Sequence, residues 1–233
     1  MALILISVLP VVLIVYYIIK RDKYEPEPFK LIAKSFLYGM IAVAPIIIVE
    51  LILQKMGGRN SNNLSAAFYN GFIVAALTEE LFKYFAVMLA VWKNPEFNEK
   101  FDGIVYAVAV SLGFALVENI MYVFQNGFGV GVTRMFTAIP GHATFGIIMG
   151  YFLGLAKFSK NPGILKFLAI LFPILAHGFY DFLLMSNEQL LVTIFFPFII
   201  FLFFVSFKLM KTHSDNSRFK NGNNNNAGDV MIN

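Results

Sequence analysis

Two adjacent carboxylates and a lysine lie in the middle of a long apolar stretch. Glu79 and Glu80 precede Lys83 by four and three residues, so on a helix one ammonium can reach either carboxylate. Two carboxylates against one cation leave an excess of negative charge. An adjacent carboxyl pair of this kind suits general acid–base catalysis. We therefore interpret Glu79 and Glu80 as catalytic candidates rather than as part of an ion pair that only joins helices.

Two histidines lie in apolar stretches further along the chain. His177 precedes Asp181 by four residues, and a helix places this carboxylate where it can orient the imidazole and fix its tautomer. His142 follows Pro140, which removes a backbone hydrogen bond and kinks a helix. Both histidines are catalytic candidates, and Asp181 is a supporting one.

Four further polar residues are supporting candidates because of their apolar surroundings. Glu118 and Asn119 are adjacent, and they could contact a substrate or bridge helices. Arg134 is the cation of the next apolar stretch. Asp102 begins an apolar stretch, where an acid also suits the helix dipole, so a structural role is equally open. A charge at the centre of a bilayer costs about 3 kcal/mol or more, which makes it a functional hypothesis.

The composition places these residues in a membrane. The chain has 233 residues, of which 58% are hydrophobic and 14% are charged, against about 25% charged in soluble domains. These values exclude a soluble globular domain, a disordered chain and a nucleic-acid-binding module. The absence of Cys excludes disulfides and a thiolate nucleophile. The sequence also lacks the Gly-x-Ser-x-Gly and HExxH motifs of serine hydrolases and zincins.

The apolar stretches are long enough to span a bilayer as helices, which takes about 20 residues each. The sequence predicts an all-α polytopic bundle with about seven spans, at 2–19, 29–53, 66–91, 101–124, 132–156, 164–185 and 190–207. We expect one transmembrane domain over 1–211. The polar, Asn-rich segment 212–233 is expected to be a disordered cytoplasmic tail.

The distribution of basic residues predicts the orientation. One side carries only Lys55 and Arg59, whereas the other side and the tail carry 13 basic residues: Lys20, Arg21, Lys23, Lys30, Lys93, Lys100, Lys157, Lys160, Lys166, Lys208, Lys211, Arg218 and Lys220. The positive-inside rule then places the N-terminus outside and the C-terminus in the cytoplasm. Basic residues follow the first span directly and none precedes it, which favours a retained helix over a signal peptide. In this orientation the polar groups outline a cavity that opens outward.

Several motifs occur together in a fixed order. They are Glu79-Glu80-x-x-Lys83, Asp102-Gly103 with Tyr106, Phe114-Ala115-x-x-Glu118-Asn119, Arg134 with His142 and Phe145, and His177 with Asp181. Over residues 78–181 this ordered set resembles the PrsW family of intramembrane proteases. It is more distantly similar to the CAAX prenyl endopeptidases and bacteriocin-processing enzymes.

The resemblance implies a multi-pass protease of the bacterial cell membrane. Such an enzyme would make the first, extracytoplasmic-side (site-1) cut in a single-pass anti-sigma factor and so lead to release of a stress sigma factor. Glu79 or Glu80 would activate a water, and His142 and His177 would orient it or stabilise the tetrahedral intermediate. The supporting groups would be Lys83, Glu118, Asn119, Arg134, Asp181 and Asp102. The lipid bilayer is the other expected partner, and no nucleic acid is expected.

Metal use and the class of function stay open from the residues alone. The two Glu and two His could bind a divalent metal such as zinc, or a Glu could activate the water directly. We favour the metal-free route and predict no cofactor, because an adjacent Glu pair rarely directs both carboxylates to one ion. The alternatives to a protease are a proton-coupled transporter that uses the same Glu and His, and a non-catalytic scaffold. The lack of two matched halves speaks against the transporter.

Overall fold

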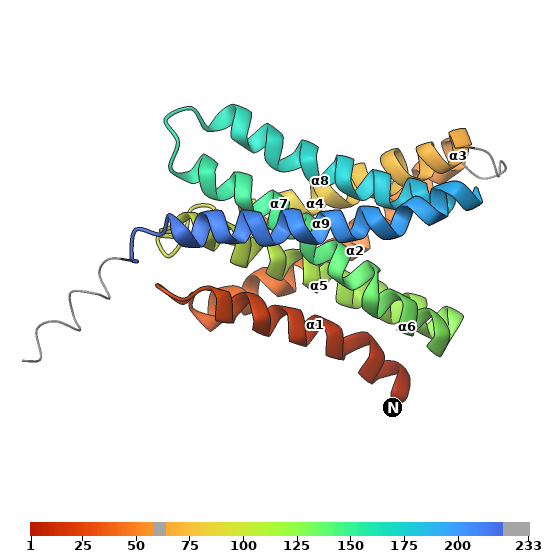
Figure 1. The fold of residues 1–233 in the computed structure, drawn as a ribbon, viewed down its shortest axis with the longest axis horizontal. Helices are drawn as coiled ribbons and strands as arrows, with labels where there is room; N and C mark the ends of the chain where they lie inside the picture. Colours follow the sequence, from red (N-terminus) through yellow and green to blue (C-terminus); the bar gives the residue numbers. More distant parts are fainter. Residues whose placement is uncertain (58–63, 221–233) are drawn as a thin grey trace, which may run out of the picture.

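The computed structural model describes residues 1–57 and 64–220, and in these ranges the chain is helical without strands. The helices are α1 (Ala2–Arg21), α2 (Phe29–Gly57), α3 (Leu64–Phe68), η1 (Tyr69–Leu77), α4 (Thr78–Ala90), α5 (Lys100–Asn126), α6 (Phe128–Phe136), α7 (Ala138–Lys157), α8 (Pro162–Met185) and α9 (Gln189–Asp215). Their long axes run side by side in a bundle (Figure 1). In the described part, six helical segments are long and apolar enough to cross a membrane: α1, α2, α5, α6 with α7, α8 and α9. The predicted all-α membrane bundle is confirmed.

The predicted span at 66–91 is a composite of three helical segments. Helix α3, the π-helix η1 and α4 follow one another without a break over Leu64–Ala90. None of the three segments reaches the length of a membrane span by itself, and α4 carries the charged side chains Glu79, Glu80 and Lys83. The π-helix ends at Leu77, and only Thr78 separates it from the acidic pair. Wider helical turns of this type occur often at functional sites.

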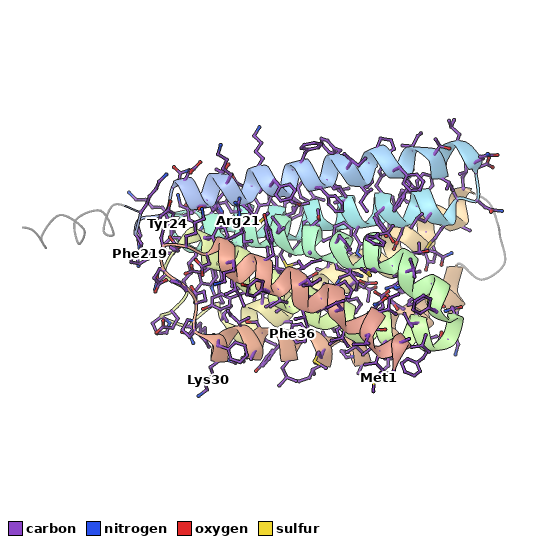
Figure 2. All side chains as sticks on the ribbon, turned by 60° about the horizontal axis from the view of Figure 1, so that its bottom comes forward. Met1, Arg21, Tyr24, Lys30, Phe36 and Phe219 are labelled. Atoms are coloured by element: carbon purple, nitrogen blue, oxygen red, sulfur yellow. The ribbon has the colours of Figure 1, made fainter. Side chains whose placement is uncertain are left out.

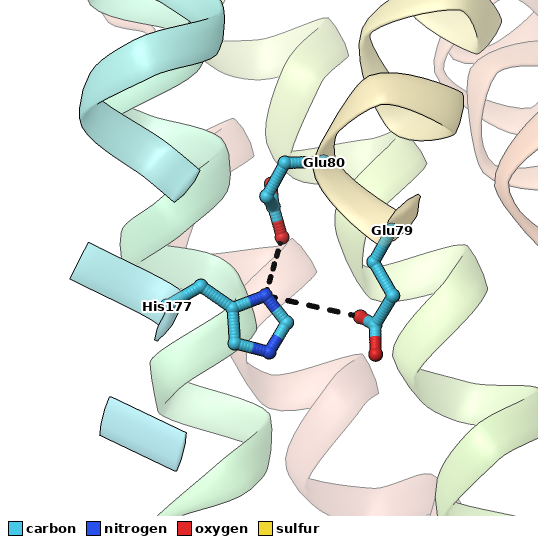
Figure 3. A group of neighbouring side chains, drawn as sticks. All are labelled: Glu79, Glu80 and His177. Atoms are coloured by element: carbon cyan, nitrogen blue, oxygen red, sulfur yellow. Dashed lines mark hydrogen bonds and ion pairs between the residues drawn. The ribbon is translucent and has the colours of Figure 1, made fainter. Parts of the chain in front are cut away.

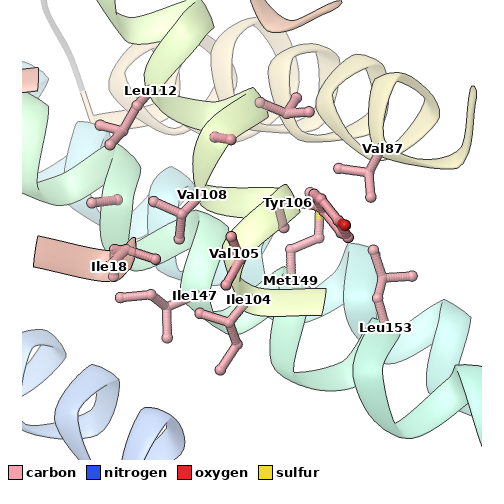
Figure 4. Packing of buried hydrophobic residues seen from close by; sticks show 14 of the residues in the cluster. Ile18, Val87, Ile104, Val105, Tyr106, Val108, Leu112, Ile147, Met149 and Leu153 are labelled. Atoms are coloured by element: carbon pink, nitrogen blue, oxygen red, sulfur yellow. The ribbon is translucent and has the colours of Figure 1, made fainter. Parts of the chain in front are cut away.

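Helix α5 is the buried axis of the bundle. Glycines let its backbone approach both neighbours closely: a Cβ at Gly39 of α2 would lie 1.9 Å from the Val110 carbonyl oxygen. Helix α7 packs on α5 in the same way, since a Cβ at Gly150 would lie 2.3 Å from the Gly103 oxygen. The aliphatic core lies between α5 and α7, around Val108, Leu112, Ile147, Met149 and Leu153 (Figure 4).

The two ends of the bundle carry different parts of the chain. Met1 lies at one end, whereas Arg21, Tyr24, Lys30 and Phe219 lie together at the other (Figure 2). The chain therefore runs from one end of the bundle to the other an odd number of times. The segment α3–η1–α4 adds one crossing to the six apolar segments and makes seven. Which end faces the cytoplasm stays a prediction from the basic residues. One of these, Arg59, lies outside the described residues.

Helix α9 continues past residue 211, where we predicted the disordered tail to begin. It reaches Asp215 because His213 is buried: its ring stacks on Tyr151 with centroids 4.2 Å apart, and its Nε2 donates to the Tyr151 carbonyl oxygen at 2.9 Å. The last part of the predicted tail, residues 221–233, lies outside the described residues.

The close approach of α7 to α5 predicts the effect of adding one methyl group. We expect Gly150→Ala to lower the free energy of unfolding by about 1–3 kcal/mol, because the new Cβ has no room beside Gly103. Gly163→Ala in α8 is the matched control, since a Cβ there meets no atom within 4 Å. We expect the control to stay within about 0.5 kcal/mol of the parent chain in a detergent unfolding titration. Equal effects of the two substitutions would contradict this packing.

Candidate active site

The four predicted catalytic residues meet around the ammonium group of Lys83. Lys83 Nζ lies 2.8 Å from Glu79 Oε2, 2.9 Å from Glu80 Oε1 and 3.2 Å from His142 Nδ1. His177 Nδ1 lies 2.9 Å from Glu80 Oε1 and 4.0 Å from Glu79 Oε2 (Figure 3). Helices α4, α7 and α8 thus contribute to one buried group of five side chains, which we call the active-site cluster.

A carboxylate outside this cluster contacts the Nε2 atom of each imidazole. His142 Nε2 lies 2.9 Å from Glu118 Oε2, and His177 Nε2 lies 3.3 Å from Asp181 Oδ2. The ammonium of Lys83 can only donate, so Nδ1 of His142 accepts and its Nε2–H donates to Glu118. Each carboxylate therefore fixes the orientation of its ring and the nitrogen that faces the cluster.

Aromatic rings form the walls of the cluster. The Phe145 ring stacks on His177 with centroids 4.7 Å apart. Lys83 Nζ lies 4.2 Å above the centre of the Phe114 ring, a cation–π contact that adds to its two ion pairs. These rings exclude water from one side of the charges and hold the side chains in fixed positions.

Glu118, Asn119 and Arg134 continue the polar network behind His142. Arg134 donates to Glu118 Oε2 at 2.7 Å and to Asn119 Oδ1 at 3.0 Å. Asn119 Nδ2 donates to the backbone oxygen of Ser7 in α1 at 3.3 Å, so this amide bridges helices, one of its two predicted roles. Arg134 is thereby the countercharge of Glu118 and ties the short helix α6 to α5.

Asp102 does not join the other supporting residues. It lies 16 residues before Glu118 on the same helix, about 24 Å along the axis. Its Oδ2 accepts the backbone N–H groups of Asn98 and Glu99 at 2.7 Å each. Asp102 thus caps the first turn of α5 at the opposite end from Glu118, which corrects its inclusion among the site residues.

A cavity of about 790 Å³ adjoins the cluster. Glu79, His142 and His177 line it, and so does Glu50 of α2, which our sequence reasoning missed. Glu50 could have been identified from the sequence, because it is a charged residue within the predicted span 29–53. The cavity also reaches Gln54 of α2, and it extends over Tyr122, Gln125, Leu184 and Met185 at the C-terminal ends of α5 and α8. It therefore lies toward the end of the bundle that we predicted to be outside.

The donor types of the cluster suit a divalent metal, but the ammonium of Lys83 lies where they converge. Glu79, Glu80 and His177 each place a possible ligand atom within 4.8 Å of the other two. This differs from our expectation that adjacent Glu side chains diverge, because Lys83 draws both carboxylates to itself. A dication held by the same oxygens would lie against this ammonium and repel it. In this arrangement the side chains can hold the Lys83 ammonium, but they cannot hold this ammonium together with a metal ion.

Residues 27–210 match a family described as PrsW family intramembrane metalloprotease. The chain is 37% identical to "Protease PrsW" of Geobacillus kaustophilus over 81% of this chain and 82% of the relative. It is 36% identical to the protein of that name from Oceanobacillus iheyensis, over 91% and 95%. For the Bacillus subtilis protein the identity is 33%, over 90% and 94%. No solved structure matches the chain.

The buried ion pairs predict the effect of removing Lys83. We expect Lys83→Met to lower the free energy of unfolding by about 3–5 kcal/mol, because it leaves two buried carboxylates without a countercharge. The measurement is an SDS unfolding titration of the purified chain in mixed micelles with chelator present. The triple variant Glu79→Gln, Glu80→Gln and Lys83→Met is the matched control, and it should regain most of the loss. Unchanged stability of Lys83→Met would contradict the pairing.

Proposed function

We propose a mechanism and a substrate class for this chain, which belongs to the PrsW family of intramembrane proteases. Family and relatives make it a multi-pass protease of bacterial membranes, and they set aside the transporter and scaffold alternatives. The observation that carries the proposal is that Glu79 both lines the cavity and contacts the Lys83 ammonium. The proposed reaction is attack of a water on one peptide bond of a single-pass membrane protein.

Glu79 is the proposed general base. It lines the cavity, whereas the Glu80 side chain is fully buried behind it and contacts Lys83 and His177. The Glu79 carboxylate would take a proton from the water as the water oxygen attacks the carbonyl carbon. It would return this proton to the amide nitrogen as the C–N bond breaks. Glu80 and Lys83 position the base and its neighbours.

The two imidazoles are the proposed stabilisers of the tetrahedral intermediate. His142 and His177 both line the cavity on the same side as Glu79. Glu118 and Asp181, which line the same cavity, hold the two rings in place. Each ring nitrogen already has a partner in this structure, so an imidazole would exchange one of these contacts for the developing oxyanion, whose charge it would then stabilise.

The substrate class follows from the position of the cavity and from the family resemblance. The cavity lies toward the bundle end that is predicted to be outside, so a segment entering there is cut on the extracytoplasmic side. We propose a membrane-anchored anti-sigma factor as substrate and this cut as the first, site-1 step. A stress sigma factor is released after the steps that follow.

Neutralising the carboxyl pair tests the role of Glu79 and Glu80. We expect Glu79→Gln and Glu80→Gln each to lower cleavage of a co-expressed, doubly tagged single-pass substrate by about 10²-fold or more, at unchanged abundance. Glu188→Gln, the same change before α9 and away from the cavity, is the control and should cleave normally. Full cleavage by both cavity variants would overturn the protease mechanism. Unchanged cleavage by the double variant His142→Ala and His177→Ala would remove only the oxyanion role.

Chelation tests the metal-free route. Because the Lys83 ammonium already lies where the two carboxylates converge, we expect the purified protease to keep its activity in EDTA or phenanthroline. The metal content measured by mass spectrometry should then be far below one ion per chain. Loss of activity that zinc restores would contradict this route and would assign Glu79, Glu80 and His177 as metal ligands.

A further inference from the structure

A second group of acidic side chains is buried at the other end of the bundle. Asp22, Glu25 and Glu27 lie in the connection between α1 and α2, and Asp102 lies in the first turn of α5. Asp22, Glu27 and Asp102 are 4%, 7% and 0% exposed. Among the described residues, no lysine or arginine forms an ion pair with any of the four. Several carboxyl groups are thus brought together here, and no described ion pair balances them.

Each of these carboxylates is held through one oxygen only. Asp22 Oδ2 accepts the backbone N–H of Glu27 at 3.1 Å, and Glu27 Oε2 accepts the hydroxyl of Tyr106. Glu25 Oε1 accepts the amide of Asn98 at 3.1 Å. The second oxygen of each carboxylate is buried and has no hydrogen-bond partner in the part of the chain that the structure describes, and the same is true of the amide oxygen Asn98 Oδ1. These carboxylate oxygens are Asp22 Oδ1, Glu25 Oε2, Glu27 Oε1 and Asp102 Oδ1.

Three of these side chains also converge around one point. Glu25, Glu27 and Asp102 each place one carboxylate oxygen within 4.8 Å of the other two. Burial, and then the charge of Asp102, raise the pKa of Glu27 to about 10. Burial also raises the pKa of Asp22 to about 7. Three carboxyl groups that converge in this way, each with a buried oxygen that no described group satisfies, have the geometry of a cation site.

We propose that Glu25, Glu27 and Asp102 bind a hard divalent cation, Ca²⁺ or Mg²⁺, with Asp22 and Asn98 at its border. We call these five residues the acid cluster. All their free donors are oxygens, the ligands that both ions prefer. Three carboxylate ligands exceed the one or two that Mg²⁺ usually takes from a protein, so Ca²⁺ is expected to bind more tightly. The ion would fasten the α1–α2 connection to the start of α5, and this proposal does not depend on the proposed protease mechanism.

The competing occupant is a proton. Glu27 and Asp102 are close enough for one carboxyl group to donate to the other, which would satisfy two of the free oxygens without a metal. In that case neither ion changes the thermal stability. The two occupants are therefore distinguished by adding the ions alone.

The test uses the full chain, purified in detergent and stripped with EDTA. We expect calorimetric titration with CaCl₂ to show one saturable site per chain and a raised Tm, with weaker binding of MgCl₂. Glu25→Gln and Glu27→Gln should each weaken Ca²⁺ binding about tenfold or more. Glu99→Gln is the matched control, because this nearby acid caps α5 and accepts the Ser217 hydroxyl, and no oxygen of it is buried without a partner. The Glu99→Gln variant should bind Ca²⁺ with the affinity of the parent chain.

A second background separates this site from the active-site cluster. The double variant Glu79→Gln and Glu80→Gln lacks the active-site carboxylates, and it should still bind one Ca²⁺ with the parent affinity. The proposal is overturned if neither ion binds the parent chain at millimolar concentration. It is also overturned if binding is lost only in this double variant, or if Glu25→Gln binds as tightly as Glu99→Gln. If the acid-cluster variants fail to fold, the Ca²⁺-dependent Tm of the parent and the double variant decides.

Discussion

The pairing of the Lys83 ammonium with two carboxylates is the interaction on which the rest of the site depends. These charges are almost fully excluded from solvent, where an unpaired charge is expensive. Pairing fixes the turn of α4 that carries Glu79 and Glu80, and the same ammonium reaches His142 on α7. Each further polar group then compensates the one before it: Glu118 holds His142, and Arg134 neutralises Glu118. Leaving any member of this network unpaired would cost more free energy than one buried hydrophobic contact contributes. The helices therefore pack in an arrangement that pairs them all.

The sequence predicted the spans and most of the cluster for one physical reason. Charges are rare in apolar stretches, so the few that occur stand out, and pairs at i, i+4 such as His177 and Asp181 are local. Asp102 was misplaced although its distance from Glu118 could be read from the helical rise. Contacts between helices were less accessible, because they depend on packing register. The nearness of Glu50 to the cavity and of Glu27 to Tyr106 is of this kind.

Helix α5 connects the two polar regions through a tightly packed core. Gly103 and Gly113 let α7 and α2 approach its backbone so closely that no side chain fits between them. Such an axis is rigid, since any rotation would drive backbone atoms into one another. It holds Glu118 beside the cavity at one end and Asp102 beside the α1–α2 connection at the other. The catalytic geometry is therefore set by backbone packing as much as by the polar contacts themselves.

The two polar regions solve the same electrostatic problem in different ways. Around the cavity, the chain supplies its own cations: Lys83 faces Glu79 and Glu80, and Arg134 faces Glu118. In the acid cluster, backbone N–H groups, a tyrosine and an amide satisfy one oxygen of each carboxylate, and no described basic side chain pairs with the remainder. Neutral donors cannot balance several buried negative charges, so the balance must come from bound protons or a bound ion. In the active-site cluster an ammonium of the chain itself already lies between the carboxylates, whereas the acid cluster has to take its positive charge from solution.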